Sequence, residues 1–303
     1  MTQKFGLIIK KIIPAFIIYK LLNTLLKPKI KKAKRAFKQA LSTPVYLDQN
    51  KLKSLQQKYS YPPNHGYDPQ TLEKRGKERA REILNLIHKR KEEINTFLEL
   101  GCFDGMVSCI LHRMGKKTTA IDKESRFFDK RALCEDVKLL KMDAAHLQFE
   151  DESFDFVFSY DSFEHFANPD TALQEAIRVV KTSGYIYLKF GPLYMSPMGL
   201  HAYESITIPY CQFLFPKKLL KDFTKEKALY PIPFNEINRW SLENYRKLWS
   251  QYSDRLKKIK YFEKSNPINL DLVIKYPSCF KSKTNCFDNL TISAIEVLFK
   301  KIS

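Results

Sequence analysis

The sequence has few glycines, and its cysteines are not arranged in pairs. Its 303 residues include 9 glycines and 15 prolines, which excludes collagen-like and linker-like chains. The six cysteines form no Cys-x-x-Cys pair and have no metal-ligand spacing, so we expect reduced thiols, a cytoplasmic location and no metal site. The alternative is that Cys279 and Cys286 form a bridge or join a metal site. With 44% hydrophobic and 13% aromatic residues, the chain can still build a large core.

Acidic residues are scarce at both ends of the chain. There are 33 of them against 52 basic residues, which gives a net charge of +19. Residues 1–60 carry a net charge of +13, residues 61–200 carry −2, and residues 201–303 carry +8. The neutral middle argues against a protein that binds nucleic acid along its whole length. A genome biased toward lysine accounts for part of the excess.

The N-terminal segment lacks an apolar run long enough to cross a bilayer, which takes about 20 residues. Lysines interrupt it, and its longest uncharged stretch is Ile12–Tyr19. Apolar residues from Phe5 to Ile17 recur at helical spacing, so we expect residues 1–60 to form an amphipathic helical arm. We expect this arm to lie on the cytoplasmic membrane face, with basic residues toward anionic head groups. These are Lys27, Lys29, Lys31, Lys32, Lys34, Arg35 and Lys38. Packing on the protein's own domain, or on a second copy, is the alternative.

Residues 61–303 alternate between apolar strand-like runs and helical stretches. The runs bounded by turns are Thr96–Leu100, Thr118–Ile121, Val137–Leu140, Phe154–Phe158 and Tyr185–Leu188. The helical stretches between them are Met106–Met114, Glu124–Cys134 and Asp170–Lys181. This alternation predicts an α/β fold with a doubly wound, mostly parallel sheet. In such a sheet the ligand crevice lies at the carboxyl ends of the strands.

Acidic residues stand at the tips of three successive predicted strands. The first strand leads into a loop that runs from Glu99 through Gly101 to Gly105, and Asp122 and Asp143 end the next two strands. Glycines let a backbone approach a ligand closely, and a carboxylate at a strand tip can accept both hydroxyls of a ribose. The pattern therefore indicates a nucleoside-binding site.

In these segments the sequence resembles the class I S-adenosylmethionine-dependent methyltransferases, in particular the branch that includes the ubiquinone and menaquinone biosynthesis methyltransferases. The resemblance is carried by FLELGCFDG (97–105), AIDKE (120–124), MDAAHLQFEDESFDFVFSYDSFEH (142–165) and ALQEAIRVVKTSGYIYL (172–188). It implies a Rossmann-like sheet of seven strands with an antiparallel last strand, and S-adenosylmethionine as cofactor.

The resemblance also implies roles for single residues. Glu99 and the backbone around Gly101 would hold the methionine end of the cofactor, and Asp122 would hold the ribose. Asp143, with the amide of Ala144, would read the adenine. Phe103 stands where the family usually has a glycine. The expected cofactor-binding set is Glu99, Gly101, Phe103, Gly105, Asp122, Asp143, Ala144 and Ser159.

The acceptor side depends on residues after the fourth and fifth strands. Methyl transfer is an in-line displacement that mainly needs alignment, with a general base where the acceptor is a hydroxyl. The expected catalytic residues are His165, His201 and Glu164. Asp161 and Tyr194 are further candidates. The other histidines are expected to be surface or packing residues: His65, His88, His112 and His146. Residues 191–240 follow the cofactor-binding core (92–190) as a long aromatic insertion, which indicates an acceptor lid or an extra helical layer on the sheet.

We therefore expect methyl transfer to a small-molecule, saccharide or lipid-linked acceptor, on oxygen, at or near a membrane surface. Three alternatives differ in class. A nicotinamide dehydrogenase would need a Gly-x-Gly-x-x-Gly turn, which this loop lacks. A nucleic-acid base methyltransferase commonly has an Asn/Asp-Pro-Pro-Tyr/Phe turn, where this chain has Ser159–Phe163. The third alternative is a non-catalytic, cofactor-binding scaffold on the membrane.

Overall fold

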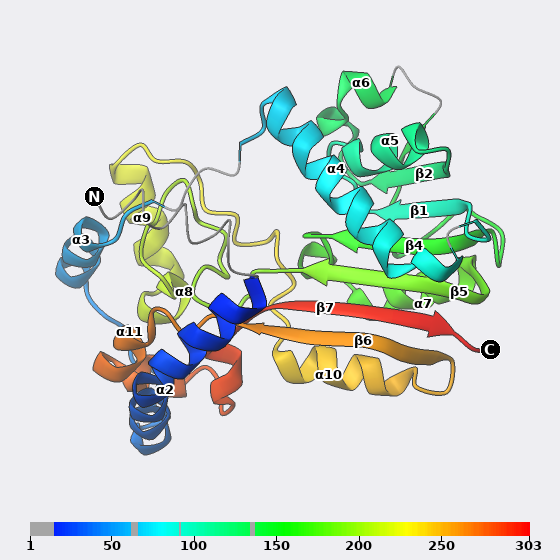
Figure 1. Cartoon of the computed structure of the whole chain (residues 1–303). Coiled ribbons are helices and arrows are strands. Elements are labelled where there is room, and N and C mark those ends of the chain that lie inside the picture. Colours follow the sequence, from blue (N-terminus) through cyan, green and yellow to red (C-terminus); the bar gives the residue numbers. More distant parts are fainter. Residues whose placement is uncertain (1–14, 62–65, 91, 134–136) are drawn as a thin grey trace.

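A seven-stranded sheet organises one half of the molecule (Figure 1). The computed structural model describes residues 15–61, 66–90, 92–133 and 137–303. The strand order is β3-β2-β1-β4-β5-β7-β6. Strands β1 to β5 pair in parallel, and β7 runs antiparallel between β5 and β6. The expected doubly wound sheet with an antiparallel last strand is therefore confirmed. The strands are β1 (Thr96–Leu100), β2 (Lys117–Asp122), β3 (Lys138–Lys141), β4 (Phe154–Tyr160), β5 (Val180–Phe190), β6 (Leu256–Ser265) and β7 (Ile292–Lys301).

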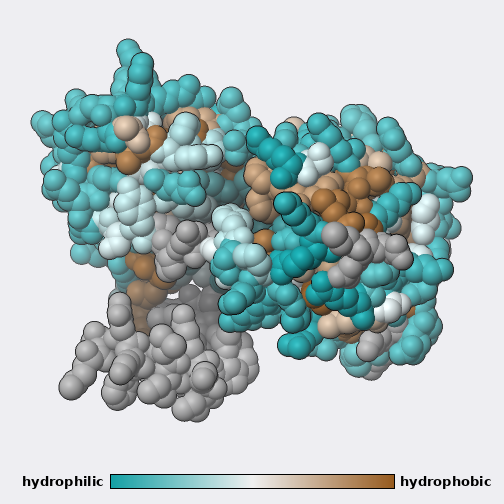
Figure 2. Space-filling model, turned by 90° about the horizontal axis from the view of Figure 1, so that it is seen from above, coloured by the Kyte–Doolittle hydropathy of each residue, from teal (hydrophilic) through white to brown (hydrophobic). Residues whose placement is uncertain are grey.

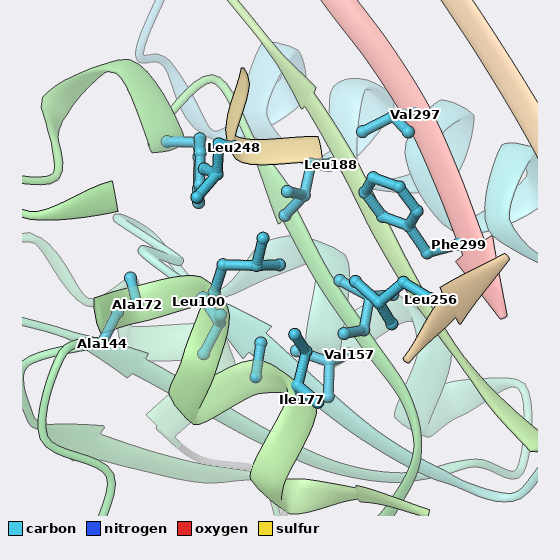
Figure 3. Packing of buried hydrophobic residues seen from close by; sticks show 14 of the residues in the cluster. Leu100, Ala144, Val157, Ala172, Ile177, Leu188, Leu248, Leu256, Val297 and Phe299 are labelled. Atoms are coloured by element: carbon cyan, nitrogen blue, oxygen red, sulfur yellow. The ribbon is translucent and has the colours of Figure 1, made fainter. Parts of the chain in front are cut away.

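Helices cover both faces of this sheet. On one face lie α4 (Pro69–Leu86), α5 (Met106–Arg113) and α6 (Lys130–Leu133), and on the other lie α7 (Pro169–Val179) and α10 (Leu242–Gln251). Each face has its own apolar cluster. In the cluster around α7 and α10, Ile177 and Leu248 from the helices point toward Leu100, Val157 and Leu188 of the strands (Figure 3). All of these side chains are nearly inaccessible to solvent, so burial on both faces explains why the central strands read as continuous apolar runs.

Two helices have other boundaries in the structure than the sequence predicts. The stretch Glu124–Cys134 is not one helix, because a short 3-10 turn at Ser125–Phe127 is followed by a separate α6. The carboxylate of Asp129 accepts a hydrogen bond of 2.9 Å from the backbone N–H of Arg131, which starts the second helix afresh. The other difference is at Asp170–Lys181, where α7 ends at Val179 and β5 begins at Val180 without a loop. Consecutive β-branched valines favour that early change to strand.

A second lobe is built from three separate parts of the chain, and it lies beside the sheet lobe in Figures 1 and 2. The insertion 191–240 contributes α8 (Cys211–Leu214) and α9 (Lys217–Glu226). The connection between β6 and β7 contributes α11 (Leu270–Lys275) and α12 (Pro277–Lys281), and the N-terminal part contributes α2 (Ala15–Gln39) and α3 (Gln49–Lys58). One apolar cluster joins all of them. The insertion therefore forms a packed helical layer with its own core.

The described part of the N-terminal arm packs on this lobe. Ala33 and Phe37 of α2 are buried, and the ring of Phe37 lies 5.7 Å from that of Phe287. Lys29 also faces the lobe, where its Nζ lies 3.4 Å from the Asp271 carboxylate. Lys27, Lys31, Lys32, Lys34, Arg35 and Lys38 are exposed.

The apolar stripe from Phe5 to Ile13 lies outside the described residues. Within the described ranges, no helix combines the length and the apolar character needed to cross a membrane.

Asp155 joins the start of β4 to its two neighbouring strands. Its carboxylate accepts hydrogen bonds from the N–H groups of Asn95 and Thr96 at 2.9 and 2.8 Å, and Lys181 Nζ lies 2.8 Å away. Burial by itself raises the pKa of Asp155, but the bond from Lys181 and those from the two amides outweigh it and lower the pKa to about 2. The ionised form is therefore preferred in the folded state.

We predict that Asp155→Asn lowers the free energy of unfolding at pH 7 by about 1–2 kcal/mol, a value reduced for partial solvent screening. Because the folded pKa is depressed, the stabilisation is present above the unfolded pKa near 4 and is lost as the pH falls toward 2. Urea unfolding of both proteins between pH 2 and 7 measures this. Asp254→Asn, at an exposed site, is the control, and an equal loss at all pH values would contradict the prediction.

Candidate active site

In the loop after β1, every second residue from Gly101 to Gly105 has a left-handed backbone conformation. Gly101, Phe103 and Gly105 have φ values of 68°, 51° and 76°, and α5 begins directly after Gly105. Phe103 thus adopts the backbone shape of the glycine for which it stands. Its ring turns outward, is 37% exposed and stacks on Phe127 with a centroid distance of 4.6 Å. The bulky residue therefore leaves the loop conformation intact.

Glu99 lies at the end of β1, beneath this loop. It is 3% exposed, and its carboxylate accepts hydrogen bonds from Ser108 Oγ at 2.7 Å and from the Ser108 N–H at 3.2 Å. Burial raises the pKa of Glu99 to about 8, although the bonds from Ser108 oppose that rise. The side chain supports the turn into α5 from inside.

Asp122 and Asp143 lie beside the loop, at the ends of β2 and β3. Asp122 accepts hydrogen bonds from the N–H of Phe103 at 2.8 Å and from that of Glu124 at 2.9 Å. Asp143 accepts one from the Ala145 N–H at 3.0 Å, and its Oδ2 lies 2.8 Å from Lys123 Nζ. The predicted strand-tip carboxylates are thus brought to one edge of the sheet.

A cavity of about 230 Å³ opens at this edge. Asp143 is on its wall, and Phe166 and residues at the start of α7 close the other side; the full lining is Lys123, Asp143, Ala145, His146, Phe166, Ala167, Asn168, Thr171 and Ala172. Ala144 lies next to this wall and is 6% exposed. Ser159 is different, because it is fully buried within β4, and its Oγ has no hydrogen-bond partner among the described residues.

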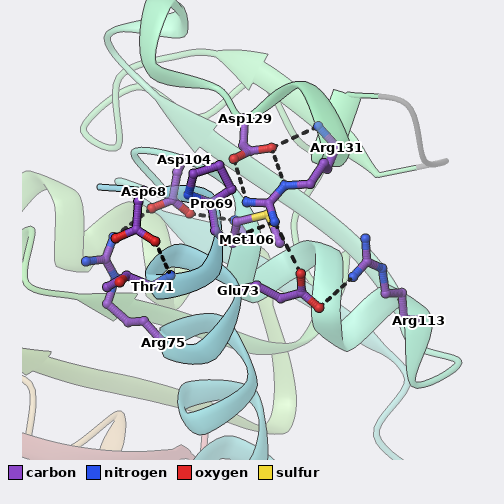
Figure 4. A network of polar contacts seen from close by, with 10 residues as sticks. All are labelled: Asp68, Pro69, Thr71, Glu73, Arg75, Asp104, Met106, Arg113, Asp129 and Arg131. Atoms are coloured by element: carbon purple, nitrogen blue, oxygen red, sulfur yellow. Dashed lines mark hydrogen bonds and ion pairs between the residues drawn. The ribbon is translucent and has the colours of Figure 1, made fainter. Parts of the chain in front are cut away.

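Helix α4 braces the loop through ion pairs (Figure 4). Arg75 lies 3.0 Å from the Asp104 carboxylate, which also accepts a hydrogen bond of 2.8 Å from the Met106 N–H at the start of α5. Two residues earlier, the Glu73 carboxylate lies 3.2 Å from the Arg131 guanidinium of α6. These contacts connect the charged helix before β1 to both helices that follow the loop.

The end of β4 touches the loop directly. Ser162 Oγ donates a hydrogen bond of 2.7 Å to the carbonyl oxygen of Gly101. A Cβ atom built on Gly101 would lie only 2.6 Å from the Ser162 Cβ, so the two backbones approach as closely as glycine allows. The sequence gives no signal for this contact, because the two residues are 61 positions apart.

Beyond Ser162, the short 3-10 turn η3 (Phe163–His165) meets the segment after β5. Glu164 is 1% exposed, and its Oε1 accepts a hydrogen bond of 2.9 Å from the Gly191 N–H. Its Oε2 is buried with no hydrogen-bond partner in the described part of the chain. Burial, with a smaller effect of the Asp161 charge, raises the pKa of Glu164 to about 8.

The two predicted catalytic histidines lie together beside Glu164. Their ring centroids are 4.8 Å apart, with the planes at 72°. One ligand atom from each of Glu164, His165 and His201 lies within 4.8 Å of the others. His165 comes from η3 and is exposed, whereas His201 comes from the insertion and is partly buried. The fold thus gathers all three predicted catalytic residues, which we call the Glu-His-His cluster.

The insertion also covers this cluster from the other side. Asn238 donates from its N–H to the Glu164 carbonyl oxygen at 2.9 Å and from its side-chain amide to the Phe163 carbonyl oxygen at 3.1 Å. The Glu236 carbonyl oxygen lies 2.5 Å from His165 Nδ1. The sequence analysis did not predict that residues 236–238 contact the cluster. Their hydrogen bonds are made by backbone atoms and by the side-chain amide of Asn238, for which the sequence gives no signal.

The remaining candidates lie outside the cluster. Asp161 is exposed and forms an ion pair with Arg79 of α4. Tyr194 packs edge-on against Phe213 in the helical lobe. His88 and His146 are exposed, His112 is partly buried, and His65 lies outside the described residues. Cys102, Cys109, Cys211, Cys279 and Cys286 carry free thiols, so the alternative bridge is absent.

Comparison with known proteins gives one family match. A sequence model described as a methyltransferase domain matches residues 98–188. A ubiquinone biosynthesis O-methyltransferase from Maricaulis maris is 29% identical over 93 residues, which is 29% of this chain and 37% of that protein. The chain therefore spans little more than a third of the length of that relative.

The solved structures found by comparison have lower sequence identity to this chain than the Maricaulis maris protein has. The PH0226 protein from Pyrococcus horikoshii has 20% identity and a TM-score of 0.48, over 74% of this chain and 90% of that one. A SAM-dependent methyltransferase from Methanosarcina mazei has 19% identity and a TM-score of 0.46, over 72% of this chain and 97% of that one.

We predict that Gly101→Ala destabilises the fold by about 2–4 kcal/mol, because the added methyl group combines a left-handed backbone with a clash against Ser162. Gly115→Ala is the matched control. Its φ is 82°, but nothing lies within 4 Å of the added Cβ, so it should cost only about 1 kcal/mol. Urea unfolding measures both variants, and equal losses would show that the close approach at Gly101 is not a constraint.

Proposed function

We propose that the chain is a class I S-adenosylmethionine-dependent methyltransferase that transfers a methyl group to an oxygen of a small-molecule, saccharide or lipid-linked acceptor. The match of residues 98–188 to a methyltransferase domain supports this proposal. The observation that carries the proposal is the position of the Glu-His-His cluster. It lies at the carboxyl ends of β4 and β5, next to the loop expected to hold the cofactor, and the insertion 191–240 covers it.

The residues along the strand ends fit S-adenosylmethionine. The left-handed backbone at Gly101 and Gly105 shapes the loop expected to hold the methionine end of the cofactor, and Asp122 is placed at the strand tip expected for a ribose. The cavity of about 230 Å³ beside Asp143 suits the adenine. The cofactor supplies the methyl group: a C–O bond forms while the C–S bond breaks, and its electron pair stays on sulfur.

The chain's part in this reaction is to hold the acceptor in line and to take up its proton. Loss of the proton makes a hydroxyl nucleophilic, and groups that accept it must lie within hydrogen-bond reach. The cluster offers one carboxylate and two imidazoles at the acceptor side, with Tyr203 stacked on His201 at 5.5 Å. An aromatic wall next to accepting groups favours a hydroxyl on a ring or a sugar.

The charge distribution supports an acceptor other than nucleic acid. The segment 61–200, which contains most of the cofactor site, has a net charge of −2. Such a nearly neutral segment offers a phosphate backbone little electrostatic attraction.

We propose in addition that α2 holds the protein at an anionic membrane surface. In the described part of α2, the buried Ala33 and Phe37 face the protein, while Lys31, Lys34 and Lys38 are exposed and separated by helical spacing. Each lysine near such a surface contributes about 1 kcal/mol. Attraction through this basic face would bring the neighbouring insertion close to lipid-linked acceptors.

We predict that the purified protein binds S-adenosylmethionine, and that Asp122→Asn and Asp143→Asn each weaken this binding about 10–100-fold, since each removes a charged hydrogen-bond acceptor. Isothermal titration calorimetry measures the dissociation constants. Turnover is then followed as release of S-adenosylhomocysteine with phenolic, saccharide and lipid-extract acceptors.

Asp254→Asn, on the exposed turn before β6, is the control for the cofactor measurement and should bind normally. Absence of cofactor binding in the unaltered protein would refute the proposed activity. Binding without turnover on any extract would favour a non-catalytic scaffold, and turnover on RNA alone would replace the acceptor class.

For the membrane surface, we predict that replacing Lys31, Lys34 and Lys38 by alanine lowers partitioning onto phosphatidylserine-containing vesicles about 100-fold. Vesicle co-sedimentation at low and high salt measures this, because electrostatic attraction is screened by salt. The matched control replaces the exposed Lys257, Lys258 and Lys264 of β6. Equal binding of the two triple variants would contradict a role for α2.

A further inference from the structure

We infer that Gln56 of α3 is a positioning residue for the acceptor side of the site, because it holds the turn of the insertion that carries Tyr203 and directly follows His201. Helix α3 (Gln49–Lys58) lies outside the matched methyltransferase domain, so the inference gives the N-terminal arm a part in the active site. The role of Gln56 in the reaction rests on the proposed methyl transfer, whereas its effect on the position of the turn does not.

The side-chain amide of Gln56 binds the backbone of the insertion as a neighbouring strand would. Its Nε2 donates to the Ser205 carbonyl oxygen at 3.0 Å, and its Oε1 accepts from the Thr207 N–H at 3.1 Å. The Thr207 hydroxyl donates a third bond, of 3.1 Å, to the backbone carbonyl oxygen of Gln56. A side-chain amide presents a donor and an acceptor side by side, so it matches both backbone groups at once, as a carboxylate cannot.

The backbone segment that Gln56 binds has little access to water. Ser205 is 1% exposed and Thr207 is 3% exposed, and Ile206 between them is also buried. A buried carbonyl oxygen or N–H that loses its partner is costly, because water does not reach it to replace the bond. The position of residues 205–207 therefore depends on the amide of Gln56.

The bound segment belongs to the same tight turn as Tyr203. The Ala202 carbonyl oxygen accepts hydrogen bonds from the Ser205 N–H at 3.0 Å and from the Ile206 N–H at 2.8 Å, so residues 202–206 form one compact unit. His201 directly precedes this unit, and the ring of Tyr203 stacks on the His201 ring with centroids 5.5 Å apart. A displacement at Ser205 is therefore passed on to both rings.

The turn is held at its other end by the segment after β5. The His201 N–H donates to the Met198 carbonyl oxygen at 3.0 Å, and His201 Nε2 lies 2.9 Å from the Pro192 carbonyl oxygen. These contacts fix the start of the turn to the insertion itself. Gln56 fixes its far end to a part of the chain that is about 150 positions away.

Helix α3 is a firm support for this contact. Leu52 and Leu55 are buried in the apolar cluster of the helical lobe, and just before the helix the Leu47 N–H donates to the Leu214 carbonyl oxygen of α8 at 2.8 Å. In Figure 1 the helix lies beside the helices of the insertion. A side chain on a packed helix holds its partner more precisely than a side chain on a loop does, so Gln56 is well placed to fix the turn.

The test compares two variants of Gln56 with a control on the same helix. Gln56→Met keeps the length of the side chain and removes both amide contacts, whereas Gln56→Glu keeps its shape and sets a carboxylate against the Ser205 carbonyl oxygen. Gln57→Glu adds the same charge at the exposed neighbouring position. The full-length proteins are labelled with ¹³C in the histidine rings and compared by NMR, and the His201 signal is assigned by its absence from His201→Gln.

We expect the His201 signal to shift in both Gln56 variants and to stay in place in Gln57→Glu. The signals of the exposed His88 and His146 should be unchanged in every variant. A loss of stability alone leaves the spectrum of the folded protein as it was, so a shift confined to His201 separates positioning from a general structural role. Circular dichroism shows which variants fold, and Gln56→Met, which buries no charge, carries the test if Gln56→Glu does not. An unchanged His201 signal in a folded Gln56→Met protein would overturn the inference.

Turnover is measured in parallel as release of S-adenosylhomocysteine with the phenolic, saccharide and lipid-extract acceptors. Gln56→Met should lower kcat about 10–100-fold and change the KM for S-adenosylmethionine by less than about twofold, because it displaces only groups on the acceptor side. Unreduced turnover in Gln56→Met would remove its role in the reaction. No turnover in the unaltered protein would instead count against the proposed methyl transfer, and the NMR result on the turn would stand.

Discussion

The close approach of two strand ends is the constraint on which the rest of the site depends. Ser162 donates its hydroxyl to the Gly101 carbonyl oxygen, and a side chain on Gly101 would collide with it. Glu164, two residues further, is bonded to Gly191 at the end of β5. The loop after β1 and the segments after β4 and β5 are thus joined by backbone contacts. For a reaction that requires a donor and an acceptor in line, such a frame places the two sides before either ligand arrives.

Two buried carboxylates lie on this frame, and their surroundings differ. The Glu99 carboxylate accepts hydrogen bonds from the hydroxyl and the N–H of Ser108, and through them it supports the turn into α5. Glu164 has one oxygen bonded and one left over, next to two imidazoles whose protonated nitrogens face carbonyl oxygens. Both carboxylates are buried to nearly the same degree, so the unsatisfied oxygen reflects the particular surroundings of Glu164 rather than burial alone.

The sequence predicted the sheet because its strands are apolar runs buried on both faces and bounded by turns. It also predicted the acidic residues at the strand tips, since parallel strands bring their carboxyl ends to one edge. It placed His165 and His201 on the acceptor side, but it could not show that they meet. They are 36 positions apart, and their contact depends on the path of the insertion and on φ of 55° at His201. The helices α11 and α12 were missed because they are too short to show a periodic pattern.

The helical lobe links the basic arm to the insertion 191–240. Phe37 of α2 packs on Phe287, Lys29 pairs with Asp271 of α11, and Tyr210 of the insertion donates to the Leu290 carbonyl oxygen at 2.6 Å. The net charge of +19 therefore resolves into a nearly neutral segment 61–200, a part of +8 in residues 201–303, and an arm of +13 whose described portion has exposed lysines and packs on the helical lobe. Contacts within one apolar cluster therefore connect the charged arm to the lobe from which the insertion supplies His201.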